Sequence, residues 1–134
     1  MSKILSKDDI LQARDVVIEA IEVPEWGGTV YVRSISAAER GLVEEGAAKF
    51  KENKGKNDSF ARTFTVKMAS MAMCDESGKR LFEEKDVIAL QQKNAAVISR
   101  IAEVAQRLSG FSKQDIEELE KNLSEAQHGD SLSV

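Results

Sequence analysis

The sequence is poor in the residues that most often perform chemistry, with one cysteine and one histidine among 134 residues. His128 lies in a C-terminal stretch without periodicity, where no neighbouring element would orient it as a general base. Cys74 is followed by Asp75 and Glu76, whereas activation of a thiol needs cationic neighbours. One cysteine and one distant histidine also cannot form a zinc site. We therefore expect a buried structural thiol, no cofactor, no metal and no enzyme activity.

Long apolar runs, an excess of positive charge and a secretion signal are also missing. No apolar run approaches the roughly 20 residues that a membrane helix needs, and the N-terminus reaches Asp8 and Asp9 too early for a signal peptide. The net charge of -4 disfavours nonspecific nucleic-acid binding, which needs a cationic surface. The lysine-rich stretch 49–56 contains one aromatic residue, Phe50, and is interpreted as a solvated loop. We expect a cytoplasmic protein that binds neither nucleic acid nor membrane.

An acidic segment after Cys74 invites comparison with a calcium-binding loop. Measured from Asp75, Gly78 comes two positions too early for an EF-hand loop. Lys79 and Leu81 then occupy positions where that loop has ligands. A surface turn is therefore expected here.

The chain does carry enough apolar residues for one packed core. Hydrophobic residues make up 42% and charged residues 31%, which is typical of a globular domain. A chain of 134 residues fits a single domain. We expect this domain to span residues 1–124, and residues 125–134 to form a disordered tail because they show no periodicity.

Two segments rich in β-branched residues predict a β-hairpin near the N-terminus. They cover residues 16–23 and 29–35, and Pro24–Gly28 lies between them. Pro24 cannot donate a ladder hydrogen bond, and the two glycines permit positive φ, so this loop is typical of a hairpin. Before the hairpin, Ser6 and Asp9 have the spacing of a helix start, and a short helix is expected to reach about Arg14.

Everything after the hairpin is predicted to be helical. Capping boxes begin at Ser36 and Ser112, and Asp58 is a further helix cap. Apolar residues at helical spacing then predict five helices, at about 36–50, 58–72, 83–90, 94–108 and 112–123. The fold class is thus α+β, mainly α, with an N-terminal β-hairpin packed on a bundle of about five helices. An isolated hairpin is marginal in water, so it must lie on the helices or pair with a partner strand.

The apolar faces of these helices supply the predicted core. Leu42 and Val43 begin the face of the first long helix, and Val87, Ile88 and Leu90 form that of the short one. The next long helix carries a stripe of aromatic and methionine residues, interpreted as core rather than as an adaptable binding surface; it comprises Phe60, Phe64, Met68, Met71 and Met73.

The candidate partner-binding residues are also apolar. Trp26, the single tryptophan, either folds back onto the helices or protrudes from the hairpin as an anchor, and Tyr31 lies on the following strand. The last helix is otherwise charged, and its narrow apolar stripe either packs within the chain or docks on a neighbouring subunit. The candidate residues are Trp26, Tyr31, Ile116, Leu119 and Leu123.

The order of these pieces resembles that of the tail assembly chaperones of long-tailed phages and prophages. The resemblance covers about residues 15 to 123, and its weight lies in the order and spacing of several landmarks. These are Val23–Gly28 with Val30–Arg33, Ser36–Arg40, Cys74–Phe82, Asp86–Val87 with Leu90, and Glu120–Asn122.

The resemblance implies a function that spacing alone would not show. Such chaperones are non-structural helpers that coat the long helical tape-measure protein and keep it in solution while tail-tube subunits polymerise. They often occur in a short form and a frameshifted long form, and this chain resembles the short form. The resemblance implies binding to the tape-measure protein, contact with the tail tube protein and no catalytic residues. The chaperone would act in the bacterial host cytoplasm and be absent from the mature virion.

Self-association would provide the repeated weak contacts that a long client needs, through the hairpin edge or the last helix. Two other functions are compatible with the sequence. One is a structural tail or tail-completion protein of the virion, and the other is a small regulatory adaptor that binds a host factor.

Overall fold

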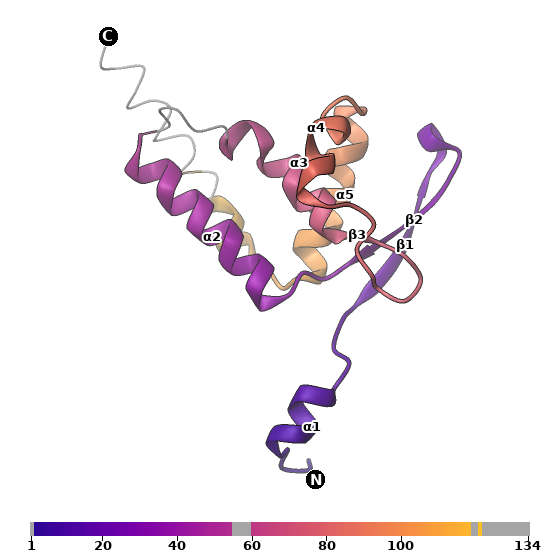
Figure 1. Ribbon diagram of the computed structural model, residues 1–134, viewed down its shortest axis with the longest axis vertical. Coiled ribbons are helices and arrows are strands. Elements are labelled where there is room, and N and C mark those ends of the chain that lie inside the picture. Colours follow the sequence, from indigo (N-terminus) through magenta and orange to yellow (C-terminus); the bar gives the residue numbers. More distant parts are fainter. Residues whose placement is uncertain (1, 55–59, 119–120, 122–134) are drawn as a thin grey trace.

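The computed structural model describes residues 2–54, 60–118 and 121. A small sheet lies on one side of the molecule and the longer helices on the other, while the N-terminal helix stands apart from both (Figure 1). The predicted tail at 125–134 and the predicted cap Asp58 lie outside the described residues. The elements, in chain order, are α1 (Lys7–Gln12), β1 (Ile18–Val23), the 3-10 turn η1 (Pro24–Trp26), β2 (Gly28–Arg33), α2 (Ala37–Glu52), α3 (Phe60–Ala72), β3 (Met73–Cys74), the 3-10 turn η2 (Glu84–Asp86), α4 (Val87–Leu90), α5 (Ala95–Leu108) and helical residues 113–118.

The predicted fold class is confirmed, and the hairpin gains one short strand. β1 and β2 are antiparallel, with Ala20 opposite Tyr31, and the loop between them turns at Gly27, whose φ is +77°. β3 then joins the other edge of β2 and places Cys74 opposite Tyr31. The sequence predicted a turn beginning at Cys74 because two residues directly after a helix are too few to show strand alternation.

The N-terminal helix is present but ends earlier than predicted. Ser6 and Asp9 form the expected capping box, since the Ser6 hydroxyl accepts from the Asp9 N–H at 3.2 Å and the Asp9 carboxylate accepts from the Ser6 N–H at 3.0 Å. Ala13 already has extended backbone angles, so α1 stops at Gln12 and does not reach Arg14.

The core forms where the inner face of the sheet and α3 meet α5. Cross-strand partners share a face of a sheet, so Val32 and Met73 lie together on the inner face. Both are at most 1% exposed, as are Met68 and Ile101. The interpretation of the methionine stripe as core is therefore confirmed at Met68, Met71 and Met73, and Phe64 packs partly buried against it. The side chain of Phe60 lies outside the described part.

Two residues predicted on buried faces are exposed instead. Ile88 is 74% exposed, whereas Val87 and Leu90 are buried. On a helix of four residues, positions three apart share a face, and the residue between them cannot reach it. Leu42, 63% exposed, likewise lies beside the buried stripe of α2 that begins at Val43.

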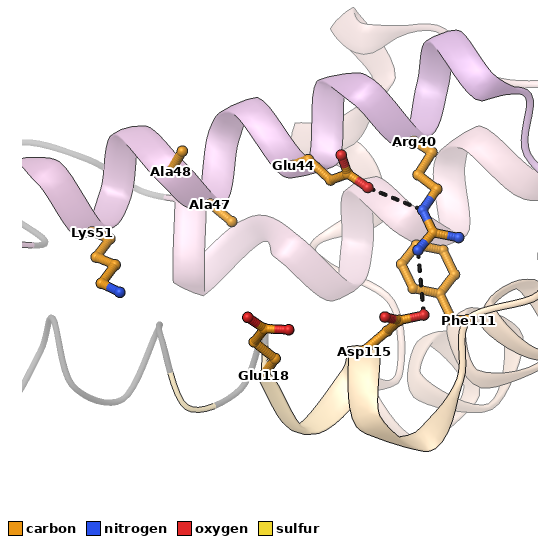
Figure 2. Close-up of a pocket in the computed structure, with 8 residues that line it drawn as sticks. All are labelled: Arg40, Glu44, Ala47, Ala48, Lys51, Phe111, Asp115 and Glu118. Atoms are coloured by element: carbon orange, nitrogen blue, oxygen red, sulfur yellow. Dashed lines mark hydrogen bonds and ion pairs between the residues drawn. The ribbon is translucent and has the colours of Figure 1, made fainter.

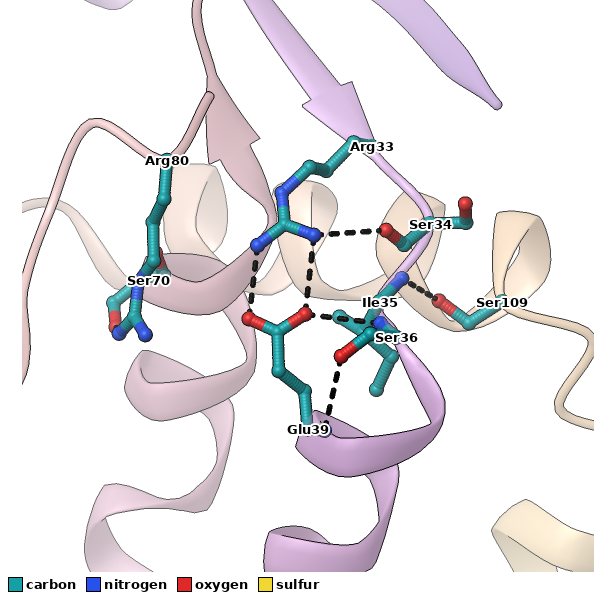
Figure 3. A network of polar contacts seen from close by, with 8 residues as sticks. All are labelled: Arg33, Ser34, Ile35, Ser36, Glu39, Ser70, Arg80 and Ser109. Atoms are coloured by element: carbon teal, nitrogen blue, oxygen red, sulfur yellow. Dashed lines mark hydrogen bonds and ion pairs between the residues drawn. The ribbon is translucent and has the colours of Figure 1, made fainter. Parts of the chain in front are cut away.

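A buried ion pair joins the end of β2 to the start of α2 (Figure 3). The Arg33 guanidinium donates to both carboxylate oxygens of Glu39, at 3.0 and 2.8 Å. Both side chains are at most 15% exposed. Glu39 also accepts from the backbone N–H of Ser36 at 2.9 Å, and the Ser36 hydroxyl accepts from the Glu39 N–H, which completes the predicted capping box. One carboxylate therefore caps α2 and fixes its direction relative to the sheet.

Replacing Glu39 with alanine leaves the Arg33 guanidinium buried without its counter-ion. We expect the free energy of unfolding, measured in urea, to fall by roughly 3 kcal/mol. Glu44→Ala is the matched control because Glu44 is an exposed partner of Arg40 on the same helix; it should cost less than about 0.5 kcal/mol. Equal losses in the two variants would show that the Arg33–Glu39 pair has no special role.

The same carboxylate should make stability depend on pH. Burial raises the pKa of Glu39, but hydrogen bonds from Arg33 and Ser36 outweigh it, and the pKa lies below its usual value of 4.5. A depressed pKa stabilises the folded state above the unfolded pKa, and this contribution is lost as the pH falls through the folded pKa. Glu39→Gln should therefore lose less stability than the native chain on acidification below about pH 4.5. Parallel pH profiles from urea unfolding would contradict this assignment.

Cys74 should be inert in the folded chain. It is 2% exposed, and burial raises the pKa of its thiol despite the nearby Arg33. A thiol reagent needs both access and a thiolate. We expect labelling of the native chain to proceed no faster than unfolding, and labelling in urea to be complete at once. Rapid labelling without denaturant would instead show a reactive cysteine.

Candidate partner-binding surfaces

The described residues hold no site for metal chemistry. No three histidine, cysteine or acidic side chains of the described chain come together as metal ligands. His128 lies outside that part. The acidic segment forms a closed surface turn, in which the Asp75 carboxylate accepts from the N–H and hydroxyl of Ser77 and from the Lys79 N–H, at 2.7 to 2.9 Å. Those hydrogen bonds lower the pKa of Asp75. None of the described helices is both long and apolar enough to cross a membrane.

Trp26 lies at the tip of the hairpin, which projects beyond the helices in Figure 1. The tip is tied to α5 because Arg100 donates to both carboxylate oxygens of Glu25, at 3.0 and 3.3 Å. This hydrogen bond lowers the pKa of Glu25. Trp26 is 36% exposed and is absent from the buried core. The Trp26 side chain is therefore partly exposed. The turn that carries it is connected to α5 by the Glu25–Arg100 ion pair.

Tyr31 lies on the outer face of the sheet. Its cross-strand partner is Ala20, whereas its neighbours Val30 and Val32 face the helices. Glu19 lies on the inner face of β1, opposite Val32, and forms an ion pair with Arg107 of α5. Tyr31 is 36% exposed, so an aromatic ring remains available beside the exposed Ala20.

Ile116 is partly covered by the core and is not fully exposed. The helical residues 113–118 begin at the predicted capping box, with both Ser112–Asp115 hydrogen bonds at 3.0 Å. Ile116 packs, partly buried, against the cluster that contains Phe111. The other two candidates on this helix, Leu119 and Leu123, lie outside the described residues.

A cavity of about 320 Å³, with several charged residues in its lining, lies between α2 and residues 111–118 (Figure 2). Arg40 lies over the Phe111 ring at 4.4 Å from its centre and pairs with Glu44 at 3.1 Å and Asp115 at 3.3 Å. The Ser112 hydrogen bonds, with a contribution from Arg40, lower the pKa of Asp115. Lys51 lies at the end of the cavity away from Arg40. The charges at the Arg40 end are thus paired with each other, and the Arg40–Asp115 pair joins α2 to the helical residues 113–118.

A second cavity, which the sequence did not reveal, lies between α2, α3 and η2. We call it the α2–α3 groove, and its volume is about 260 Å³. Lys67 and Glu84 form its polar rim, with 3.7 Å between their charged atoms. The sequence contains one signal of this groove, namely Leu42. It is an additional apolar residue directly before Val43, where the buried stripe of α2 begins, and it is 63% exposed. The remaining lining residues are Val43, Gly46, Phe64 and Met71.

Known proteins share both the sequence pattern and the fold of this chain. Residues 9–122 match the family model described as phage tail assembly chaperone. The tail assembly chaperone of bacteriophage HK97 has a similar fold, with a TM-score of 0.56 and 20% sequence identity. The similarity covers 75% of this chain and 94% of that one. No curated protein sequence gave a significant match. Because the family model spans most of the sequence, the chain belongs to the phage tail assembly chaperone family.

Proposed function

We propose that this chain binds the tape-measure protein of its phage and keeps it in solution while the tail assembles. The match of residues 9–122 to the tail assembly chaperone family carries the proposal. The described residues support it because they offer exposed apolar side chains and no cluster of metal ligands. A long apolar helix in water needs such surfaces, since covering apolar area is what prevents its aggregation.

The hairpin is the surface that we assign to this client. Trp26 and Tyr31 are large aromatic residues, each about one third exposed, and residues of this type dominate binding energy at interfaces. The Glu25–Arg100 pair already holds the tip in place, so little conformational entropy is lost when a partner binds. Each contact is small, and many copies along one client would provide the necessary avidity.

The net charge of -4 suits the same role. A client coated with copies of an acidic protein carries repeated negative charge, which opposes association between coated chains. We place this activity in the cytoplasm of the bacterial host, with the chaperone released before the virion matures.

Co-expression with the tape-measure protein tests the function directly. The native chain should raise the soluble fraction of that protein and co-purify with it. Trp26→Ser combined with Tyr31→Ser should reduce the co-purified amount by about tenfold or more, because aromatic anchors contribute most of such binding. Leu81→Ser, which removes an apolar side chain that is 53% exposed outside the hairpin, is the matched control.

Thermal unfolding of each variant separates a binding defect from a folding defect. No gain in client solubility with the native chain would overturn the proposed function. The presence of the chain in purified mature particles, measured by mass spectrometry, would favour a structural tail protein instead.

A further inference from the structure

The free edge of β1 carries backbone groups that no strand satisfies. The strand order is β1-β2-β3, so β1 is paired along one edge only. The Ser34 N–H donates to the Val17 carbonyl at 2.8 Å, and this bond fixes which residues of the antiparallel ladder point toward β2. Within the described chain, the alternate residues of β1 make no backbone hydrogen bond on the other edge. They are Ile18, Ala20 and Glu22.

This edge lacks most of the features that keep edge strands from pairing. The six residues of β1 lie opposite consecutive residues of β2, so the strand contains no bulge. It also contains neither proline nor lysine. Ala20 and Glu22 are exposed, so the described residues leave this part of the strand uncovered. Folded proteins usually protect an edge by one of these means, and a regular edge without them is suited to receive another strand.

The edge is acidic at both ends and apolar between them. Asp15 precedes the strand and Glu22 lies near its end; both are exposed, and neither forms an ion pair with the described residues. Ile18 and Ala20 lie between them and share the outer face of the sheet. Opposite charges on neighbouring strands stabilise their pairing, and like charges destabilise it. An extended segment with a basic residue at each end and β-branched residues between them therefore matches this edge.

A second copy of this strand matches the edge poorly. β1 contains two glutamates and no basic residue, so pairing of two β1 edges gives neither carboxylate a counter-ion in any register. If the pairing is centred on Ala20, for example, each Glu22 lies opposite Ile18 of the other copy. The charge of the edge therefore favours a different protein over self-association through the hairpin.

A helical partner does not match the edge either. An α-helix uses its backbone N–H and C=O groups within itself, whereas an open sheet edge is satisfied by the backbone of an extended segment. The edge is thus a different kind of surface from the exposed side chains of Trp26 and Tyr31, to which we assign the client. What binds at the edge does not depend on that assignment.

We propose that the free edge of β1 binds an extended, basic segment of a partner protein, which adds to the three-stranded sheet as a further strand. The backbone of this segment pairs with Ile18, Ala20 and Glu22. Its basic residues lie near Asp15 and Glu22, and its β-branched residues lie beside Ile18 and Ala20. The backbone hydrogen bonds provide affinity, and the charged and apolar side chains provide specificity.

Amide exchange with a model peptide tests the proposal on the full chain. The probe is a blocked peptide of alternating threonine and valine with a lysine at each end. The amides of Ile18, Ala20 and Glu22 should exchange rapidly in the free chain and about tenfold or more slowly with the peptide. Glu19 and Ile21 are bonded to β2 and should be protected in both states. A matched peptide that ends in glutamate should bind about tenfold more weakly.

Two substitutions of Ala20 separate backbone pairing from side-chain contact. Ala20→Pro removes an N–H that points away from β2, and proline is tolerated at such edge positions. The fold should therefore be retained, and the peptide should no longer protect Ile18 and Glu22. Ala20→Thr keeps the N–H and is the matched control, which should bind the peptide as the native chain does. Glu22→Lys should reverse the preference, so that the peptide with glutamate ends binds more tightly than the one with lysine ends.

Three outcomes would overturn the proposal. The first is unchanged exchange at Ile18, Ala20 and Glu22 in the presence of the lysine peptide. The second is equal binding of the two peptides to the native chain, or an unaltered preference in Glu22→Lys; this comparison also decides the matter if Ala20→Pro does not fold. The third is protection of the same three amides as the concentration of the chain rises without peptide, which would assign the edge to a second copy. In each case the proposed client of Trp26 and Tyr31 is unaffected.

Discussion

The packing of β2 and α3 on α5 forms the core and holds the sheet against the helices. Val32 and Met73 bring the inner face of the sheet onto Ile101, and none of the three is more than 1% exposed. Burial of apolar area at this junction supplies most of the driving force that orders the sheet. The buried Arg33–Glu39 pair adds direction, because it sets the angle at which α2 leaves the sheet. Without the junction, neither the groove beside α2 nor the fixed hairpin tip would exist.

Because the core uses one face of each element, other apolar residues remain on the surface. These residues lie on the outer face of the sheet, at the hairpin tip, in the lining of the α2–α3 groove and on α1, and include Tyr31, Trp26, Leu42 and Ile10. Each group is small, as expected for a protein that must itself stay dispersed. These groups lie on separate surfaces of the described chain. The family assignment and the exposed apolar groups are both consistent with the proposed binding of other polypeptides.

Most of the fold could be predicted because local signals specify it. Capping boxes at Ser6, Ser36 and Ser112 and the Pro24–Gly28 loop are short-range features, and all are present. Features that depend on distant contacts could not be predicted. β3 forms only because α3 ends beside β2, and the exposure of Ile88 follows from the shortness of α4. Of the candidate binding residues, Trp26 and Tyr31 are partly exposed and Ile116 is packed against the core. The α2–α3 groove is formed by α2, α3 and η2 together, so no single segment of the sequence predicts it.

Amide hydrogen exchange, compared between the free chaperone and its complex with the tape-measure protein, tests whether the hairpin binds the client, since it shows where the client lies on the folded chaperone. We expect the client to slow exchange in the hairpin, from Val23 to Tyr31, and to leave exchange in the α3–α5 core unchanged. Protection of the amides that surround the Arg40 cavity, with an unprotected hairpin, would show that the client binds elsewhere. A complex in which no amide of the chaperone gains protection would also overturn the assignment of the hairpin.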